Sequence, residues 1–397
     1  MRSTATRGRV LDVVREQGQV SRVELAQATG LTQATISTVV RTLLDEGLLT
    51  ESGAREFTGG KPRIKLTLNP RARCALGVQL AADWITVCIV DAAGAIIART
   101  RVRGAGDEAP ETSVTRIATT LERLMSLADI SRNILVGLGL AVPGVVNLEL
   151  GQIQRSLSLP QFDAYPIRDA LASATGLDVS LENNGTAAAI GESWNRGARD
   201  SQAQCTVYMG ASIGAGLILA GRVYRGSSGN VGAISPLQLS VPSWSEPHSL
   251  EALAGPRGVA ARARLALQRG RHSAIVLPEY DRDPFLDFTA VASAAIAGDP
   301  LGMSLLEESA DHLASAIVAT ANMLDLDSVV LAGPSFTLAG SLYLSVIQQR
   351  LDEAFYARGS HRVTVWLSGQ IADAAAVGAA ANMLQQELSP RAVGTPG

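Results

Sequence analysis

The apolar positions at the start of the chain predict three short helices. Residues 4–17, a segment after Ser21 and a segment after Thr32 each repeat apolar side chains every three or four positions. Ser21 with Glu24 three residues later is the capping-box pattern of a helix start. A glycine follows each segment, at positions 18, 30 and 47. The glycine-containing turn between the second and third segments predicts a helix-turn-helix.

The exposed side of the third predicted helix carries short polar side chains and an arginine, the residue types that contact base edges and phosphates. Alternation of polar and apolar residues over 58–68 predicts the returning strand of a wing hairpin. Its basic residues, beside glycines, suit a minor groove. A structural three-helix bundle that binds no DNA is the alternative. The expected DNA-contacting residues are Ser21, Gln33, Thr35, Ser37, Thr38, Arg41, Lys61 and Arg63.

The rest of the chain has the pattern of an α/β domain. Continuous apolar runs predict strands at 75–80 and 85–90, a buried parallel strand and turn within 134–146, and further strands at 328–334 and 363–366. Helical spacing predicts helices over 111–128, 305–324 and 373–384. We therefore expect a winged helix-turn-helix domain over residues 1–70 and an α/β domain over residues 71–390.

A strand end that feeds a helix marks a candidate ligand site. The apolar run Leu177–Leu181 precedes Asn183 and Asn184, which open a helix of small residues. Open α/β sheets bind their ligands at the carboxyl ends of strands. We therefore expect the two amides to face a ligand.

These segments resemble the ROK family of sugar kinases and sugar-responsive repressors over residues 6 to about 386. The resemblance implies a winged helix-turn-helix on a two-lobed actin-like (ribonuclease H-like) α/β domain. It also implies operator DNA and a sugar-like effector as partners, and assembly into a homodimer or tetramer. The segments that carry it include Leu31-Thr32-Gln33-Ala34-Thr35-Ile36-Ser37, Gly59-Gly60-Lys61-Pro62, the corner at Asn183-Asn184, and the glycine-spaced turn Gly210-Ala211-Ser212-Ile213-Gly214-Ala215-Gly216.

The chain departs from the family's kinases where their chemistry takes place. Asn184 stands where the kinases have the Asp that activates a sugar hydroxyl, and a neutral amide cannot accept a proton near pH 7. Gln79-Leu80-Ala81-Ala82-Asp83 replaces the phosphate-binding Asp-x-Gly-Gly-Thr. We therefore expect no enzyme and no bound cofactor.

The family's sugar and zinc ligands are partly missing. Gly232-Ala233-Ile234-Ser235-Pro236 replaces Gly-Glu-Ile-Gly-His, and the zinc loop is shortened without cysteine, so we expect no metal site. Glu251 matches a sugar-binding Glu, although it also suits a helix cap. The loop 156–162 matches a sugar-contacting loop or is an ordinary surface loop. The expected effector-binding residues are Ser158, Gln161, Asn183, Asn184 and Glu251.

Charge is distributed unevenly along the 397 residues. Residues 1–75 carry 12 Lys+Arg and 7 Asp+Glu, whereas the whole chain carries 34 and 37. The N-terminal part, called the head below, is therefore basic, and the remainder, called the body, is acidic. This distribution suggests that only the head binds a polyanion. The cysteines, at 74, 88 and 205, are too far apart for a disulfide framework or a zinc site. The N-terminus lacks the apolar core of a signal peptide, and the longest apolar stretch, residues 134–146, is too short to span a membrane, so we expect a cytoplasmic protein.

The sequence thus predicts a repressor of carbohydrate metabolism or transport genes that responds to a sugar or sugar derivative. Two alternatives remain open. One is a sugar kinase with a DNA-binding head, and the other is an effector-independent DNA-binding protein whose body serves only as a dimerisation scaffold.

Overall fold

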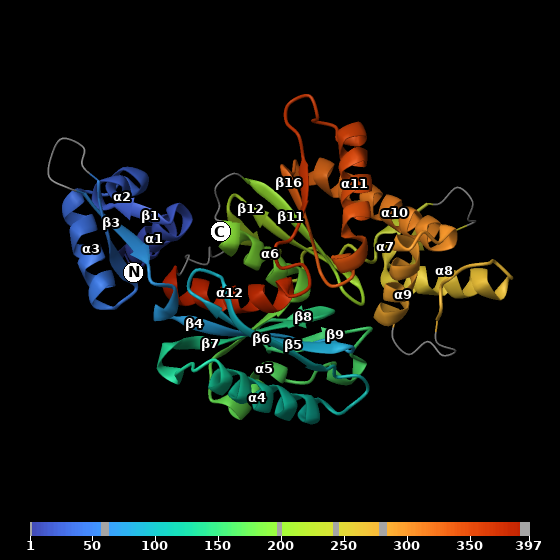
Figure 1. Ribbon diagram of the computed structural model, residues 1–397, viewed down its shortest axis with the longest axis horizontal. Coiled ribbons are helices and arrows are strands. Elements are labelled where there is room, and N and C mark those ends of the chain that lie inside the picture. Colours follow the sequence, from blue (N-terminus) through green and yellow to red (C-terminus); the bar gives the residue numbers. More distant parts are fainter. Residues whose placement is uncertain (1, 57–62, 197–200, 241–245, 278–283, 390–397) are drawn as a thin grey trace.

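A computed structural model describes residues 2–56, 63–196, 201–240, 246–277 and 284–389. The N-terminal part is a winged helix at one end of the molecule (Figure 1). Its three strands pair antiparallel in the order β1-β3-β2. Its elements are α1 (Arg2–Gln17), β1 (Gln19–Ser21), α2 (Arg22–Thr29), α3 (Gln33–Asp45), β2 (Leu49–Glu56) and β3 (Arg63–Leu68).

The three helices predicted for the head are confirmed, with their ends. Ser21 accepts a hydrogen bond from the Glu24 amide and Glu24 accepts one from the Ser21 amide, so the capping box is complete. Gly18, Gly30 and Gly47 have φ of 76°, 66° and 70°. This left-handed backbone is easy only for glycine and ends each helix.

The body consists of two lobes built on similar sheets (Figure 1). The first has the strand order β10-β7-β4-β5-β6, in which β4, β5 and β6 are antiparallel and β4, β7 and β10 are parallel. Its elements are η1 (Pro70–Ala72), β4 (Cys74–Gln79), β5 (Trp84–Asp91), β6 (Ile96–Arg103), α4 (Pro110–Leu127), η2 (Arg132–Ile134), β7 (Leu135–Val142), β8 (Val145–Asn147), β9 (Gln152–Arg155), η3 (Pro160–Phe162), α5 (Ile167–Thr175) and β10 (Val179–Asn183).

The second lobe repeats this plan. Its sheet has the order β13-β12-β11-β16-β17, with β11, β12 and β13 antiparallel and β11, β16 and β17 parallel. The remaining elements are α6 (Asn184–Arg196), β11 (Ala203–Met209), β12 (Ile213–Leu219), β13 (Arg222–Tyr224), β14 (Gln238–Leu239), β15 (His248–Ser249), α7 (Leu250–Ala254), α8 (Pro256–Gln268), α9 (Pro284–Ile296), α10 (Pro300–Leu324), β16 (Ser328–Ala332), α11 (Phe336–Ala354), β17 (Thr364–Leu367) and α12 (Ala374–Leu388).

The predicted α/β organisation of the body is confirmed. The runs at 75–80 and 85–90 are β4 and β5, and the buried run within 134–146 is β7, which is parallel to both of its neighbours. The last helix continues four residues beyond the predicted end, to Leu388. It lies between the lobes and ends beside the head (Figure 1).

Each lobe has its own core, and a third core joins the head to the body. Val10, Leu11 and Val14 of α1 belong to the same buried cluster as Val377 and Leu384 of α12. Head and body therefore share buried apolar surface, which favours a fixed arrangement over a loose tether. Within the described residues, no single helix is both long and apolar enough to cross a membrane, although the sharply bent pair α9 and α10 passes on length and composition.

Candidate DNA-binding surface and effector site

Helix α3 presents a row of polar side chains to solvent. Ile36, Val40 and Leu43 are buried against the rest of the head. Gln33, Ser37 and Arg41, spaced four residues apart, are exposed, and so is Thr38. Residues four apart lie on one face of a helix, so this row forms a single surface. Thr35 is half-buried, and its hydroxyl lies 2.9 Å from that of the helix-capping Thr32.

The remaining predicted DNA contacts have different positions. Ser21 is only 2% exposed and its hydroxyl caps α2, so we remove it from the candidate surface. Lys61 lies outside the described residues. Arg63 is the first residue of β3, the returning strand of the wing. Part of the predicted surface, on α3, is therefore assembled in the structure.

The predicted ligand corner forms where β10 ends and α6 begins. The Asn183 side-chain amide donates a hydrogen bond to the Gly144 carbonyl at 2.7 Å, and its oxygen accepts one from the Gly185 amide at 2.9 Å. Asn183 therefore fixes the turn from strand to helix. Asn184 is the first residue of α6 and is 9% exposed. Its Oδ1 is buried and accepts no hydrogen bond from any described residue.

Thr186, in the first turn of α6, has a second polar atom of this kind. Its hydroxyl is also buried without a partner in the described part of the chain. An unsatisfied buried acceptor is costly, so Asn184 Oδ1 is a place where a donor from a ligand or water would be favoured.

Glu251 approaches the same corner from the other lobe. Ser249 supplies the capping hydroxyl of α7, and Glu251 lies in the first turn of that helix, where a carboxylate is favourable, so the predicted helix-start role of Glu251 stays open beside the sugar-binding role. The Glu251 carboxylate accepts a hydrogen bond from the Ile213 amide at 2.9 Å. The next residue, Gly214, is close to Asn183: a methyl group on it would lie 3.9 Å from Asn183 Oδ1. The start of β12 thus lies between Asn183 and Glu251.

Burial changes the acidity of Glu251. It raises the pKa to about 7 from the ordinary value of 4.5, although the Ile213 amide and the charge of Arg257 act in the opposite direction. Glu251 can therefore exist as a neutral acid or a carboxylate near neutral pH. The neutral acid can donate a hydrogen bond, whereas the carboxylate can only accept hydrogen bonds.

Replacing Glu251 by Gln is expected to remove a pH dependence of stability. Between pH 4.5 and about 7 the folded chain binds more protons at Glu251 than the unfolded chain, so its stability falls as the pH rises through this window. The Gln side chain retains an acceptor for Ile213 and does not titrate. Urea unfolding measures this: from pH 5 to pH 8 the free energy of unfolding should fall by up to about 3 kcal/mol more in the wild type than in Glu251→Gln. An equal change of unfolding free energy with pH in the wild type and in Glu251→Gln would contradict the raised pKa of Glu251.

The predicted loop 156–162 meets the corner at one end. A methyl group on Gly144, the acceptor for Asn183, would lie 3.0 Å from the Ser156 Cα. Ser158 is half-buried, and its hydroxyl lies 3.3 Å from that of Ser156. The Gln161 side chain instead donates to the Gly106 carbonyl at 2.6 Å. Ser156 thus lies beside the corner and Ser158 contacts Ser156, whereas Gln161 joins two loops of the first lobe.

A buried hydrogen bond joins the lobes where the kinases' first phosphate motif would lie. Gln79, at the position of the motif's leading Asp, donates to the Tyr208 hydroxyl at 2.6 Å. Gln79 and Tyr208 are 6% and 3% exposed. Gln79 lies on β4 of one lobe and Tyr208 on β11 of the other. In place of a carboxylate that would hold a metal–nucleotide, the two side chains satisfy each other.

A second buried polar cluster was not anticipated from the sequence. Glu182, beside Asn183, is 3% exposed and accepts hydrogen bonds from Arg225 and, at 3.4 Å, from Asn382 of α12. A charged residue directly after the apolar run that ends at Leu181 was the available signal, since a buried charge needs a partner. Among the described residues no group of three or more His, Cys, Asp or Glu side chains is placed to hold a metal ion. Cys74, Cys88 and Cys205 are unpaired and buried.

Comparison with known proteins gives a consistent result for both parts of the chain. Residues 75–386 match the ROK family, and residues 4–50 match a family described as winged helix-turn-helix DNA-binding. A putative xylose repressor from a Caldicellulosiruptor species is 24% identical over 96% of this chain and 95% of its own length. A glucokinase from Halalkalibacterium halodurans is 26% identical over 80% of this chain and 97% of its own.

A solved structure matches the whole fold. The crystal structure of a ROK family transcriptional regulator, a homologue of the Escherichia coli MLC protein, superposes with a TM-score of 0.77 at 21% identity. The match covers 98% of this chain and 97% of that protein. The predicted winged helix on a two-lobed sugar-kinase-like domain is thereby confirmed.

Proposed function

The chain belongs to the ROK family, and from this premise we propose that it is a DNA-binding transcription regulator. It represses genes of carbohydrate metabolism or transport and responds to a sugar or sugar derivative. The observation that carries the proposal is the exposed polar row on α3 of a winged helix-turn-helix, joined to a kinase-like body. The putative xylose repressor matches 96% of this chain, whereas the glucokinase matches 80% of it.

The two regions have separate roles in this proposal. Residues 1–70 bind operator DNA through Gln33, Thr35, Ser37, Thr38 and Arg41 of α3 and through Lys61 and Arg63 of the wing. Residues 71–390 bind the effector and assemble the chain as a homodimer or tetramer in the cytoplasm. One small helix-turn-helix offers little contact, so two heads on a palindromic site are needed for tight and specific binding.

The effector site is the corner shared by Ser158, Asn183, Asn184 and Glu251. Amides both donate and accept hydrogen bonds, and hydroxyls of a polyol do the same. The unsatisfied Asn184 oxygen and the Glu251 carboxyl supply further positions. A ligand with a higher affinity for one relative position of the lobes shifts the population toward it, and the attached heads move with the lobes.

DNase I footprinting on the protein's own promoter region tests this proposal. The protected region should contain two half-sites, and a sugar recognised as effector should change the protection. Full protection that no sugar changes would favour the scaffold alternative, in which the body only dimerises.

The purified chain is expected to show no ATP-dependent phosphorylation of sugars. Asn184 cannot act as a general base, and the Gln79–Tyr208 hydrogen bond occupies the position of the phosphate motif. Because the Gln79–Tyr208 hydrogen bond would remain, Asn184→Asp alone should not create activity. A coupled assay for ADP release across a panel of hexoses and pentoses measures this, with the Halalkalibacterium halodurans glucokinase as positive control. Sugar-dependent turnover by the wild type would favour the kinase alternative.

A further inference from the structure

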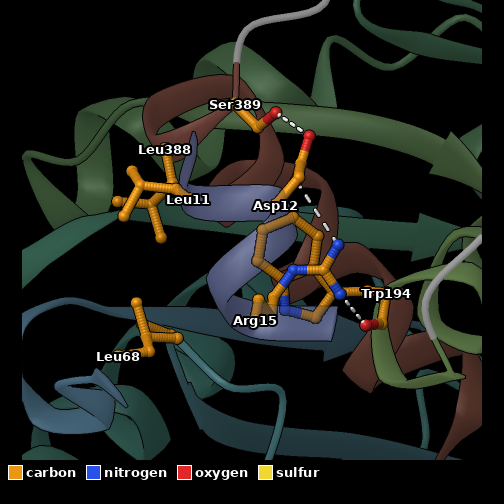
Figure 2. A pocket seen from close by; sticks show the side chains of 8 residues that line it. Leu11, Asp12, Arg15, Leu68, Trp194, Leu388 and Ser389 are labelled. Atoms are coloured by element: carbon orange, nitrogen blue, oxygen red, sulfur yellow. Dashed lines mark hydrogen bonds and ion pairs between the residues drawn. The ribbon is translucent and has the colours of Figure 1, made fainter. Parts of the chain in front are cut away.

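Helix α6 connects the proposed effector corner to the DNA-binding head. It begins at Asn184 and carries Trp194 in its last turn. The Arg15 guanidinium of α1 lies 4.1 Å from the centre of the Trp194 ring and also donates to the Trp194 carbonyl. Trp194 is 4% exposed. Figure 2 shows the two side chains stacked beside Asp12 and Ser389.

The Arg15–Trp194 contact holds α1 in place because a buried charge makes two directional interactions, one with the indole ring and one with the Trp194 carbonyl. Only 8% of the Arg15 side chain is exposed, and Asp12 lies 3.4 Å from its guanidinium. A cation over an indole ring gains about 1–2 kcal/mol when it is desolvated. Moving Arg15 away from Trp194 would leave a buried charge without part of its compensation. Helix α1 is therefore held at a defined position on the end of α6.

Helix α12 runs beside α6 and reaches the same place. A methyl group on Gly378 would lie 1.7 Å from the Ala187 carbonyl, and one on Gly191 would lie 3.0 Å from the Gly378 Cα. The two helices thus touch through their backbones with no side chain between them. Beyond the end of α12, the Ser389 hydroxyl donates to Asp12 at 2.6 Å. Such close packing leaves little room for one helix to move without the other.

We propose that α6 and α12 form a rigid unit that couples the inter-lobe corner to the head, with the Arg15–Trp194 contact as its joint. Arg15 and Trp194 are positioning residues, because neither contacts the corner. A helix of 13 residues spans about 20 Å, so a displacement at Asn184 is carried to Trp194 and then to α1. The use of this unit in regulation rests on the proposed function, whereas its existence does not.

Coupling between two sites is reciprocal, so a change at the Arg15–Trp194 contact must also alter the stability of the corner at Asn184. The test is hydrogen–deuterium exchange of the full chain, without DNA or effector. In Arg15→Met, exchange should accelerate about threefold or more over residues 184–191 as well as over 9–17. Arg15→Lys, which keeps a cation over the ring, should restore most of the protection.

Arg7→Met is the matched control on the same helix. Arg7 pairs with Glu46 inside the head at 2.6 Å, so its loss should alter exchange in the head alone. Acceleration in Arg15→Met that is confined to 9–17 and 192–196 would overturn the proposal. Trp194→Phe provides a second variant if Arg15→Met does not fold, because it keeps a ring and the carbonyl acceptor. Neither result depends on operator binding, so failure of the proposed function would be seen separately in the footprint.

Discussion

Replacing Gln33 and Arg41 together by alanine is expected to weaken operator binding by about a hundredfold or more. Both side chains are exposed on the polar row of α3. Each specific base contact contributes about 1–3 kcal/mol, and a lost phosphate contact lowers the salt dependence of binding by about one counterion. Fluorescence anisotropy with labelled operator at several salt concentrations measures both effects.

Arg103→Ala is the matched control for this variant. Arg103 is exposed on β6 of the body, so its replacement changes the net charge equally but leaves the head intact. It should bind operator with nearly unchanged affinity and salt dependence. If the α3 variant retained wild-type affinity, or if Arg103→Ala weakened binding as much, the α3 surface would not be the DNA-binding surface.

Replacing Asn183 by alanine is expected to abolish the effector response while operator affinity changes less than about threefold. The side chain lies at the inter-lobe corner, far along the sequence from the head, and it holds the start of α6 through Gly144 and Gly185. The loss of these two hydrogen bonds costs about 1–3 kcal/mol of stability, so the variant should still fold. Operator binding with and without sugars that release the wild type measures the response.

Asn183→Asp tests the donor role of this side chain. A carboxylate still accepts from the Gly185 amide but cannot donate to the Gly144 carbonyl or to a hydroxyl acceptor. It should therefore respond poorly, because a carboxylate oxygen would replace the donor that faces the Gly144 carbonyl. An unchanged effector affinity in Asn183→Ala would place the ligand elsewhere.

Features of this chain that depend on neighbouring residues could be predicted from the sequence. The capping box of Ser21 and Glu24 and the left-handed glycines at 18, 30 and 47 act within a few residues of themselves. The continuous apolar run of β7 predicts a strand that is buried on both faces, as the structure has it. The strand-to-helix corner at Asn183 was predictable for the same reason, since a change of hydrophobic period marks it.

Burial and long-range partners required the tertiary structure. Ser21 has the right chemistry for a DNA contact, and only packing shows that it is 2% exposed. Gln79 and Tyr208 are 129 residues apart, and Arg15 and the Trp194 carbonyl are 179 apart. Periodicity shows which face of an element is buried but not which other element covers it. The core joining α1 to α12, and with it the link between the head and the effector corner, is decided by the packing of the two lobes and the head.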